Sequence, residues 1–176
     1  MSVVLRKDIF TTTSRDIDGI KQIEFQAKDA LQKAATTGPN AIASPAIRPL
    51  LASDLNTSLA AGTAAFSVTA SAAGNQSIIS NFSIPSGQMY VFYGVLDLTA
   101  GTKYVDSIQF TINGNVIPLE PLPIVDVQQG PEPAVYFSPI KAVVPRSQLS
   151  ITAHFTAAGT ETLVIKGYIA QSGSAS

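Results

Sequence analysis

The residue best suited to acid–base chemistry near neutral pH is His154, the only histidine in the chain. It stands between Thr152 and Thr156 on the polar face of an alternating segment, where a histidine ordinarily faces solvent. A Ser-His-Asp arrangement needs only one histidine, but the sequence has no Gly-x-Ser-x-Gly turn or comparable nucleophile motif. One histidine is also too few for a multi-histidine metal site. We therefore predict that the protein is not an enzyme.

Acidic residues after residue 60 are the next candidates, because a pair of carboxyl groups can divide acid and base roles. Their spacing in the sequence indicates no particular pair, and we expect them to be solvated or to cap turns. They are Asp97, Asp106, Glu120, Asp126, Glu132 and Glu161. The glycines form no phosphate-binding loop, and no oxygen-rich loop is typical of a calcium site. The absence of cysteine excludes disulfides, thiolate metal sites and a cysteine nucleophile. The sequence therefore predicts no metal and no cofactor.

Aromatic side chains offer a different chemistry, since they can form a platform for sugars. The candidates are Tyr90, Phe92, Tyr93, Tyr104, Tyr136, Phe137 and Tyr168. The chain has no tryptophan, and most of these residues alternate within predicted strands, where packing in the core is their usual role. A lectin-like or receptor-binding module of a phage fibre or surface appendage is therefore the alternative function, with its pocket expected in residues 118–145.

Charge is scarce in this chain of 176 residues: 13% of them are charged, against about 25% in ordinary soluble domains. The net charge of −1 gives no electrostatic reason to bind nucleic acid or an anionic membrane. Only ten charged residues fall within 61–176, which indicates either a neutral surface of Ser, Thr, Asn and Gln or a surface buried in an assembly; we favour the assembly. The sequence starts without a signal-peptide pattern and has no membrane-spanning window, so we expect a soluble protein made in a cytoplasm.

A helix is predicted over residues 16–35, where apolar side chains recur at helical spacing. The stripe consists of Ile20, Ile23, Ala27, Ala30, Leu31 and Ala34. Gly38 and Pro39 end the pattern. Because the stripe is mostly alanine, the helix needs a partner to lie on. A strand over residues 20–25 is the competing interpretation.

Residues 37–62 are predicted to form an extended arm, because their prolines disfavour both helix and sheet interior. The segment is more apolar than an ordinary linker, so we expect it to lie along a neighbouring subunit or along its own sandwich. Its candidate interaction residues are Pro39, Ile42, Pro45, Ile47, Pro49, Leu50 and Leu51. The predicted organisation is a helix and arm in 1–62, a β-domain in 63–170 and a flexible tail in 171–176.

From Ala64 onward the hydrophobic period changes to two, which is typical of strands. The clearest signal is Asn113-Gly114 between two alternating runs, which predicts a two-residue hairpin that pairs Phe110 with Ile117. Its return strand is expected at a sheet edge, because Pro118 cannot donate a ladder hydrogen bond. Seven of the eleven prolines lie between 118 and 145, a predicted irregular excursion. Together these patterns predict a mainly β protein, an antiparallel sandwich or jelly roll of about eight strands behind a helix and an extended arm.

The longest predicted strand, residues 88–98, is apolar on both faces. Strict alternation places Tyr90, Phe92 and Leu96 on one face and Met89 on the other. Only one face of a sheet in a sandwich can point inward, so the second must be covered by the N-terminal region or by another subunit. We take Tyr90, Phe92 and Leu96 as candidate interaction residues.

A cysteine-free, charge-poor β-sandwich in residues 64–170 behind the proline-marked arm of 38–51 resembles the small cement, or decoration, proteins of tailed bacteriophage capsids, and more broadly virion jelly-roll proteins. The resemblance is one of architecture and composition. It implies a homo-oligomer, with a trimer favoured, that binds the major capsid protein or other virion proteins and clamps neighbouring capsomers. It places the protein on the capsid surface of a virion after synthesis in the host cytoplasm.

Overall fold

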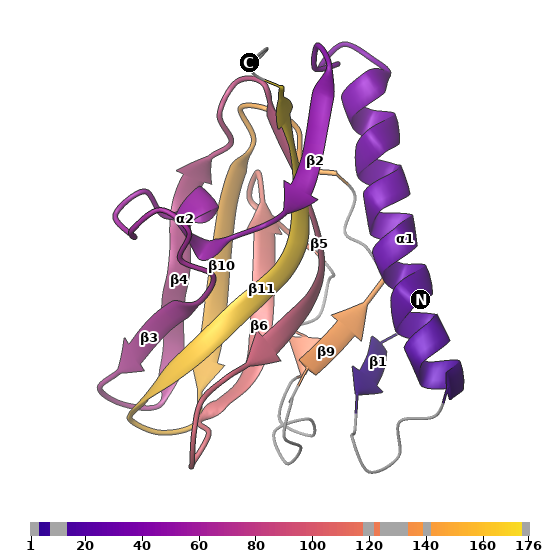
Figure 1. Ribbon diagram of the computed structural model, residues 1–176. Helices are drawn as coiled ribbons and strands as arrows, with labels where there is room; N and C mark the ends of the chain where they lie inside the picture. The colour runs from indigo at the N-terminus through magenta and orange to yellow at the C-terminus, as the bar shows by residue number, and fades with distance from the viewer. Residues whose placement is uncertain (1–3, 8–13, 118–121, 124–133, 139–141, 174–176) are drawn as a thin grey trace.

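Two antiparallel β-sheets face each other, and a long helix lies against the outer face of one of them (Figure 1). The computed structural model describes residues 4–7, 14–117, 122–123, 134–138 and 142–173. The prediction of a mainly β, antiparallel sandwich behind an N-terminal helix is confirmed.

We call the six-stranded sheet, which lies nearer the viewer in Figure 1, sheet A, and the five-stranded sheet behind it sheet B. Sheet A has the order β1-β9-β5-β11-β2, and β3 also pairs with β11; its strands are β1 (Val4–Lys7), β2 (Pro45–Pro49), β3 (Phe66–Ala70), β5 (Gln88–Asp97), β9 (Ala134–Phe137) and β11 (Gly159–Ser172). Sheet B has the order β4-β10-β6-β7, and β8 also pairs with β6; its strands are β4 (Gly74–Ser83), β6 (Val105–Ile112), β7 (Asn115–Val116), β8 (Leu122–Pro123) and β10 (Gln148–Phe155). In the described residues, nine strands follow residue 63, and β1 and β2 add N-terminal segments to sheet A.

The predicted hairpin joins β6 and β7 in the expected register. Asn113 and Gly114 have φ angles of 51° and 79°, as a type I′ turn requires. The Ile117 amide donates to the Phe110 carbonyl over 2.9 Å, so these two residues pair as predicted. Strand β7 stands at the end of the order of sheet B, in agreement with the predicted edge. Pro118 and Leu119 lie outside the described residues.

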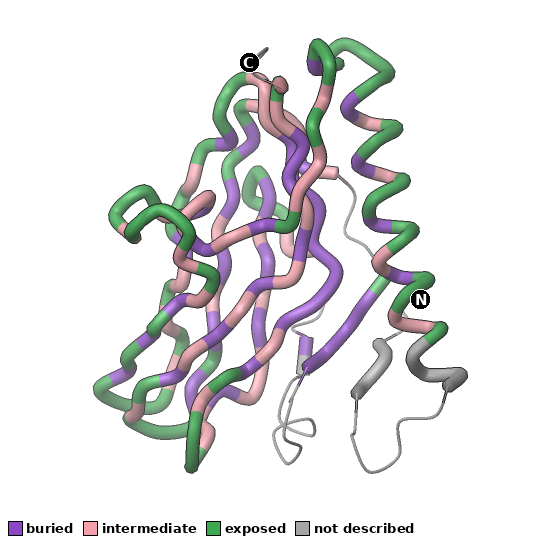
Figure 2. The backbone as a smooth tube through the Cα atoms, in the orientation of Figure 1, coloured by how far each residue is buried: buried purple, intermediate pink, exposed green. Residues whose placement is uncertain are grey.

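The main core lies between the sheets, whose strands carry many buried residues (Figure 2). It contains aromatic rings from both sheets. Phe92 of β5 contacts Phe110 of β6, with ring centroids 5.3 Å apart, and Phe110 contacts Phe137 of β9 at 5.9 Å. All three rings are fully or almost fully buried. Burying a phenylalanine contributes about 1.5–3 kcal/mol, so this aromatic contact across the sandwich is a large part of what holds the two sheets together.

A β-bulge in β5 changes which residues share a face. Lys166 of β11 pairs with Gly94 and Gly167 pairs with Phe92, so Tyr93 is an extra residue with no partner of its own in this ladder. Beyond the bulge the alternation is inverted. Strict alternation places Leu96 with Tyr90 and Phe92, and this grouping is wrong: Leu96 lies on the opposite, outer face of sheet A.

Helix α1 (Ser14–Thr36) covers part of that outer face and confirms the predicted helix over the competing strand. Its buried side chains are Ile23, Ala27, Leu31 and Ala35, and they form a second cluster with Met89, Val91 and Tyr93 of β5. The alanines allow the helix to approach the sheet closely. The second apolar face of β5 is therefore covered by the N-terminal region of the same chain.

Gly167 is predicted to be essential for the close packing of β11. A side chain here would collide with the Val91 carbonyl oxygen and lie 3.1 Å from the Leu50 side chain, so Gly167→Ala should lower the free energy of unfolding by about 1–3 kcal/mol. Urea denaturation measures the change. Thr162→Ala, on the same strand, is the control and should have little effect; equal stabilities of the two variants would contradict the prediction.

Candidate functional site

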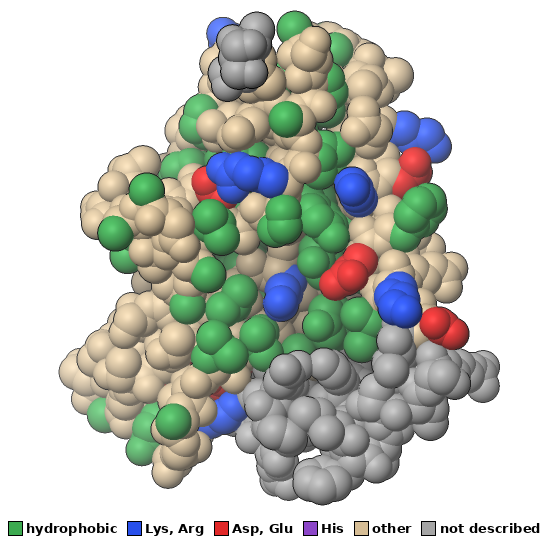
Figure 3. Space-filling model, viewed as in Figure 1, with side chains coloured by type: hydrophobic (Ala, Val, Ile, Leu, Met, Phe, Trp, Pro, Cys, Tyr) green, Lys and Arg blue, Asp and Glu red, His purple; other side chains and the backbone are tan. Residues whose placement is uncertain are grey.

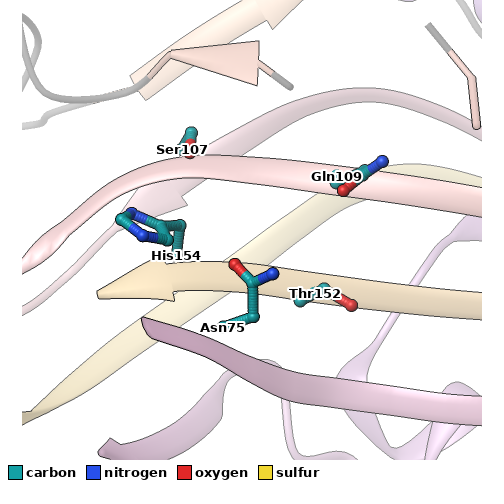
Figure 4. A pocket seen from close by; sticks show the side chains of 5 residues that line it. All are labelled: Asn75, Ser107, Gln109, Thr152 and His154. Carbon is teal, nitrogen blue, oxygen red and sulfur yellow. The ribbon is translucent and has the colours of Figure 1, made fainter. Parts of the chain in front are cut away.

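The outer face of sheet B carries a shallow polar pocket of about 260 Å³, shown in Figure 4. Three neighbouring strands line it with Asn75 of β4, Ser107 and Gln109 of β6, and Thr152 and His154 of β10. All five are polar residues, and none is the Phe, Tyr or Trp that usually forms a sugar-stacking platform. The pocket can donate and accept hydrogen bonds, but none of its lining residues belongs to the predicted region 118–145, most of which lies outside the described residues.

The His154 side chain contacts the Asp106 carboxylate at the surface of sheet B. Its Nδ1 atom lies 2.9 Å from Asp106 Oδ1, and the two side chains are 45% and 32% exposed. The Ser107 hydroxyl donates to the same Asp106 oxygen over 2.8 Å, so it bonds to the carboxylate and not to the imidazole. This arrangement differs from a catalytic triad, in which the histidine lies between the serine and the aspartate.

The scattered carboxylates have different surroundings. Asp97 at the end of β5 and Glu161 near the start of β11 come together as a buried pair, which their sequence spacing did not indicate. Asp106 lies beside His154. Glu120, Asp126 and Glu132 lie outside the described residues. Among the residues that the structure describes, no group of three or more His, Cys, Asp or Glu side chains could hold a metal ion.

Three of the candidate aromatic residues form a stacked row on the outer face of sheet A. The Tyr93 ring lies between Tyr136 and Tyr168, with centroid distances of 6.4 and 5.4 Å. Burial raises the pKa of Tyr93, and the neighbouring Tyr168 and the Glu24 carboxylate raise it further. Tyr93 and Tyr136 are buried, and Tyr168 is half-buried at the exposed end of the row. The row therefore offers one accessible ring and no open platform.

The predicted arm lies along its own sandwich. Strand β2 pairs with β11 from Tyr168↔Pro49 to Ser172↔Pro45, and the Leu50 amide donates to the Gly167 carbonyl over 3.0 Å. The exposed arm residues are Pro39 and Pro49, the half-buried ones are Pro45, Ile47 and Leu51, and the buried ones are Ile42 and Leu50. Only the exposed and half-buried residues are open to another molecule.

An ion pair fastens the arm where β2 meets the short helix α2 (Ala52–Leu55). Arg48 donates two hydrogen bonds to the Asp54 carboxylate, over 2.8 and 2.6 Å, and the Leu51 amide donates a third over 2.8 Å. Burial alone would raise the pKa of Asp54, but the bonds from Arg48 and Leu51 outweigh it and hold that pKa below its usual range. The carboxylate form therefore stabilises the arm, and this contribution is lost as the pH falls through the lowered pKa.

Tyr90 and Phe92 cannot form a contact with another subunit in this structure. Both rings lie between the sheets and are 0% exposed, and the Tyr90 hydroxyl bonds to Gln88. Leu96 alone of the three candidate strand residues is half-exposed, because the bulge turns it outward. The aromatic residues belong to the core because sheet B, and not a partner, covers that face.

The accessible apolar surface of sheet A lies beside α1, and the sequence patterns did not identify it. Leu96 of β5 pairs directly with Val164 of β11, and Tyr168 follows Val164 on the same face. Pro49, opposite Tyr168, and Leu98, which is 52% exposed, extend this row. We call these five residues the apolar face. Figure 3 shows hydrophobic side chains gathered on this side of the molecule, with a few charged groups among them. Its signal in the sequence was the run of apolar residues from 88 to 98, but the bulge could not be seen there.

Comparison with known proteins gives no relative: no protein-family model, no curated protein and no solved structure matches the chain. Within the described residues, no helix is both long and apolar enough to span a bilayer. The apolar face, the polar pocket and the buried carboxyl pair are therefore interpreted from their geometry alone.

The Arg48–Asp54 pair is predicted to control local opening of the arm. Asp54→Asn removes the charge that holds Arg48, so amide exchange of residues 45–55 should become several-fold faster while exchange in β10 is unchanged. Hydrogen exchange followed by mass spectrometry measures both. Asp29→Asn is the matched control, since its contact with Lys33 spans 3.9 Å between exposed side chains. Equal exchange of the arm in the two variants would show that the ion pair does not hold it.

Proposed function

We propose that the protein is a structural subunit of a virion, a cement or decoration protein that stabilises a capsid shell by binding neighbouring capsomers. The apolar face of sheet A is the observation that supports this proposal most directly. Accessible apolar side chains gathered on one face, here with Lys166 among them, are typical of surfaces that another protein covers. The exposed Phe25 of α1, 71% accessible, adds a further apolar side chain available for contact.

The charges bordering the apolar face indicate the chemistry of its partner. Lys166 lies on the outer face of β11, between Val164 and Tyr168. On α1, Glu24 lies close enough to Tyr93 to influence it, and Lys21 and Lys28 lie one helical turn on either side of Glu24. Three lysines and one glutamate favour a partner surface that combines apolar side chains with carboxylates. We assign this surface to the major capsid protein.

The polar pocket supports a binding or catalytic role less well. Its serine bonds to the aspartate and not to the histidine, and its lining has no Phe, Tyr or Trp. The architectural resemblance to capsid cement proteins agrees with an adhesive role on the virion surface. It also favours a homo-oligomer, a trimer, as the assembled form.

The proposed oligomer predicts a solution mass well above that of one chain, which is 18.4 kDa. Sedimentation equilibrium of the full chain at about 10 and about 100 µM measures it. A trimer is the expected species, because a symmetric contact of about 800 Å² per partner would hold subunits together in this range. A monomer at both concentrations would overturn the self-association.

Binding to shells is predicted to depend on the apolar face. Val164→Glu places a charge in the proposed contact. It should lower the affinity for capsid shells that have been stripped of this protein by about tenfold or more, which corresponds to about 1.4 kcal/mol. Co-sedimentation with the shells gives the affinity. Ser80→Glu, which adds the same charge at an exposed position of β4, is the control and should bind as the wild type does. Wild-type protein that stays in the supernatant would overturn the proposed function.

A further inference from the structure

Two carboxyl groups and one ammonium group are buried together where the loop of residues 98–104 leaves sheet A. Asp97 is 3% exposed and Glu161 is 0% exposed. The Lys103 side chain, 10% exposed, places its Nζ atom 3.5 Å from Asp97 Oδ2 and donates to the Asp97 carbonyl over 3.3 Å. Two carboxyl groups thus face one ammonium group. If both carboxyl groups are ionised, the interior carries an excess negative charge.

Glu161 accepts several hydrogen bonds from this loop. The Thr99 hydroxyl and the Tyr104 amide donate to its two oxygens, and the Val105 amide donates over 3.3 Å. Thr99 also ties the loop to its surroundings, because its amide donates to Asp97 Oδ1 and its hydroxyl oxygen accepts from the Thr162 amide, each over 2.8 Å. The loop is therefore held mainly through the two carboxyl groups.

One oxygen of this cluster has no hydrogen bond. Asp97 Oδ2 is the buried side-chain atom without a hydrogen-bond partner in the part of the chain that the structure describes, although Lys103 lies within ion-pair distance. A buried acceptor without a donor costs about 1–3 kcal/mol. A proton on Glu161 would supply the missing donor and would also remove the excess negative charge.

We propose that Asp97 and Glu161 share one proton in the folded protein, carried by Glu161 and donated to Asp97 Oδ2, and that this proton fastens loop 98–104 to sheet A. The cluster retains its proton at pH values where an exposed glutamate has lost its own. When the proton leaves, two adjacent buried carboxylates repel each other and the loop loosens. This device goes beyond the proposed function and does not rest on it.

Among the residues that the structure describes, the neighbouring elements contain few other titratable groups. Strand β3 pairs with this part of β11, with Val68 opposite Glu161, and its sequence Phe-Ser-Val-Thr-Ala has none. From the loop come Lys103 and the Tyr104 phenol, whose ring packs against Gly159. Asp106 of β6 bonds to His154 on the outer face of sheet B. The charge balance of the cluster therefore depends on Asp97, Glu161 and Lys103.

The direction of the pKa of Glu161 agrees with this assignment. Burial raises it, the bonds from Thr99 and Tyr104 lower it, and the neighbouring Asp97 raises it again, with a net increase. A raised pKa in the folded state means that the protonated form stabilises the fold. This contribution is complete below the ordinary glutamate pKa of about 4.3 and is lost as the pH rises through the higher folded value.

The test follows the Glu161 carboxyl carbon directly, in protein labelled with ¹³C-glutamate. The chain has four glutamates, Glu24, Glu120, Glu132 and Glu161, so the spectrum contains few signals. The signal that is missing from the Glu161→Gln spectrum belongs to the Glu161 carboxyl carbon. In wild-type protein we expect this signal to titrate with a midpoint above about 4.3. Asp97→Asn should move the midpoint down, because it removes the charge that shares the proton. Asp106→Asn is the control and should leave the midpoint unchanged.

A midpoint at or below about 4.3 in the wild type would overturn the proposal without any variant. A raised midpoint that Asp97→Asn leaves in place would also overturn it, since burial alone would then be responsible. Hydrogen exchange of loop 98–104 gives the second readout: exchange should accelerate as the pH rises through the measured midpoint, after correction for the intrinsic rate. A monomeric protein, or one that does not bind shells, would contradict the proposed function and leave this titration as expected.

Discussion

Strand β5 has apolar side chains on both faces, and burying both requires a layer on each side of sheet A. Sheet B covers Phe92 and its neighbours, and α1 covers Met89, Val91 and Tyr93. At about 25 cal/mol per Å² of apolar surface, leaving either face in water would cost a large part of the stability of a domain this size. The alanine-rich helix and the two sheets therefore depend on each other, and the N-terminal region is part of the folded body.

The bulge at Tyr93 gives the molecule its accessible apolar surface. With one extra residue in β5, Leu96 turns away from the main core and meets Val164 on the outer face, where it packs half-exposed against the cluster formed with α1. A regular strand would have buried Leu96 between the sheets, because side chains alternate with a period of two. The contact surface that we assign to a capsid partner thus follows from a local irregularity of the backbone.

The arm and the loop at the end of β5 are both held by charged groups that the sheets bring together. Arg48 and Asp54 are six residues apart in the sequence, whereas Asp97 and Glu161 are far apart and meet because β5 and β11 are neighbours. The first pair fastens the arm to its own sandwich. The second fastens the loop that begins at the exposed Leu98. Polar contacts of this kind add little net energy, but leaving any one partner alone would be costly.

The sequence by itself determined the class of the fold, the helix and the Asn113–Gly114 hairpin, because these depend on local spacing and turn chemistry. It also showed that both faces of β5 must be covered by other parts of the structure. Only the tertiary structure decided what covers it, where the arm lies, and which carboxyl groups meet, since these depend on strand order. The bulge explains the misplaced Leu96: one extra residue inverts every later position of a strand, and an apolar run on both faces carries no pattern that would reveal it.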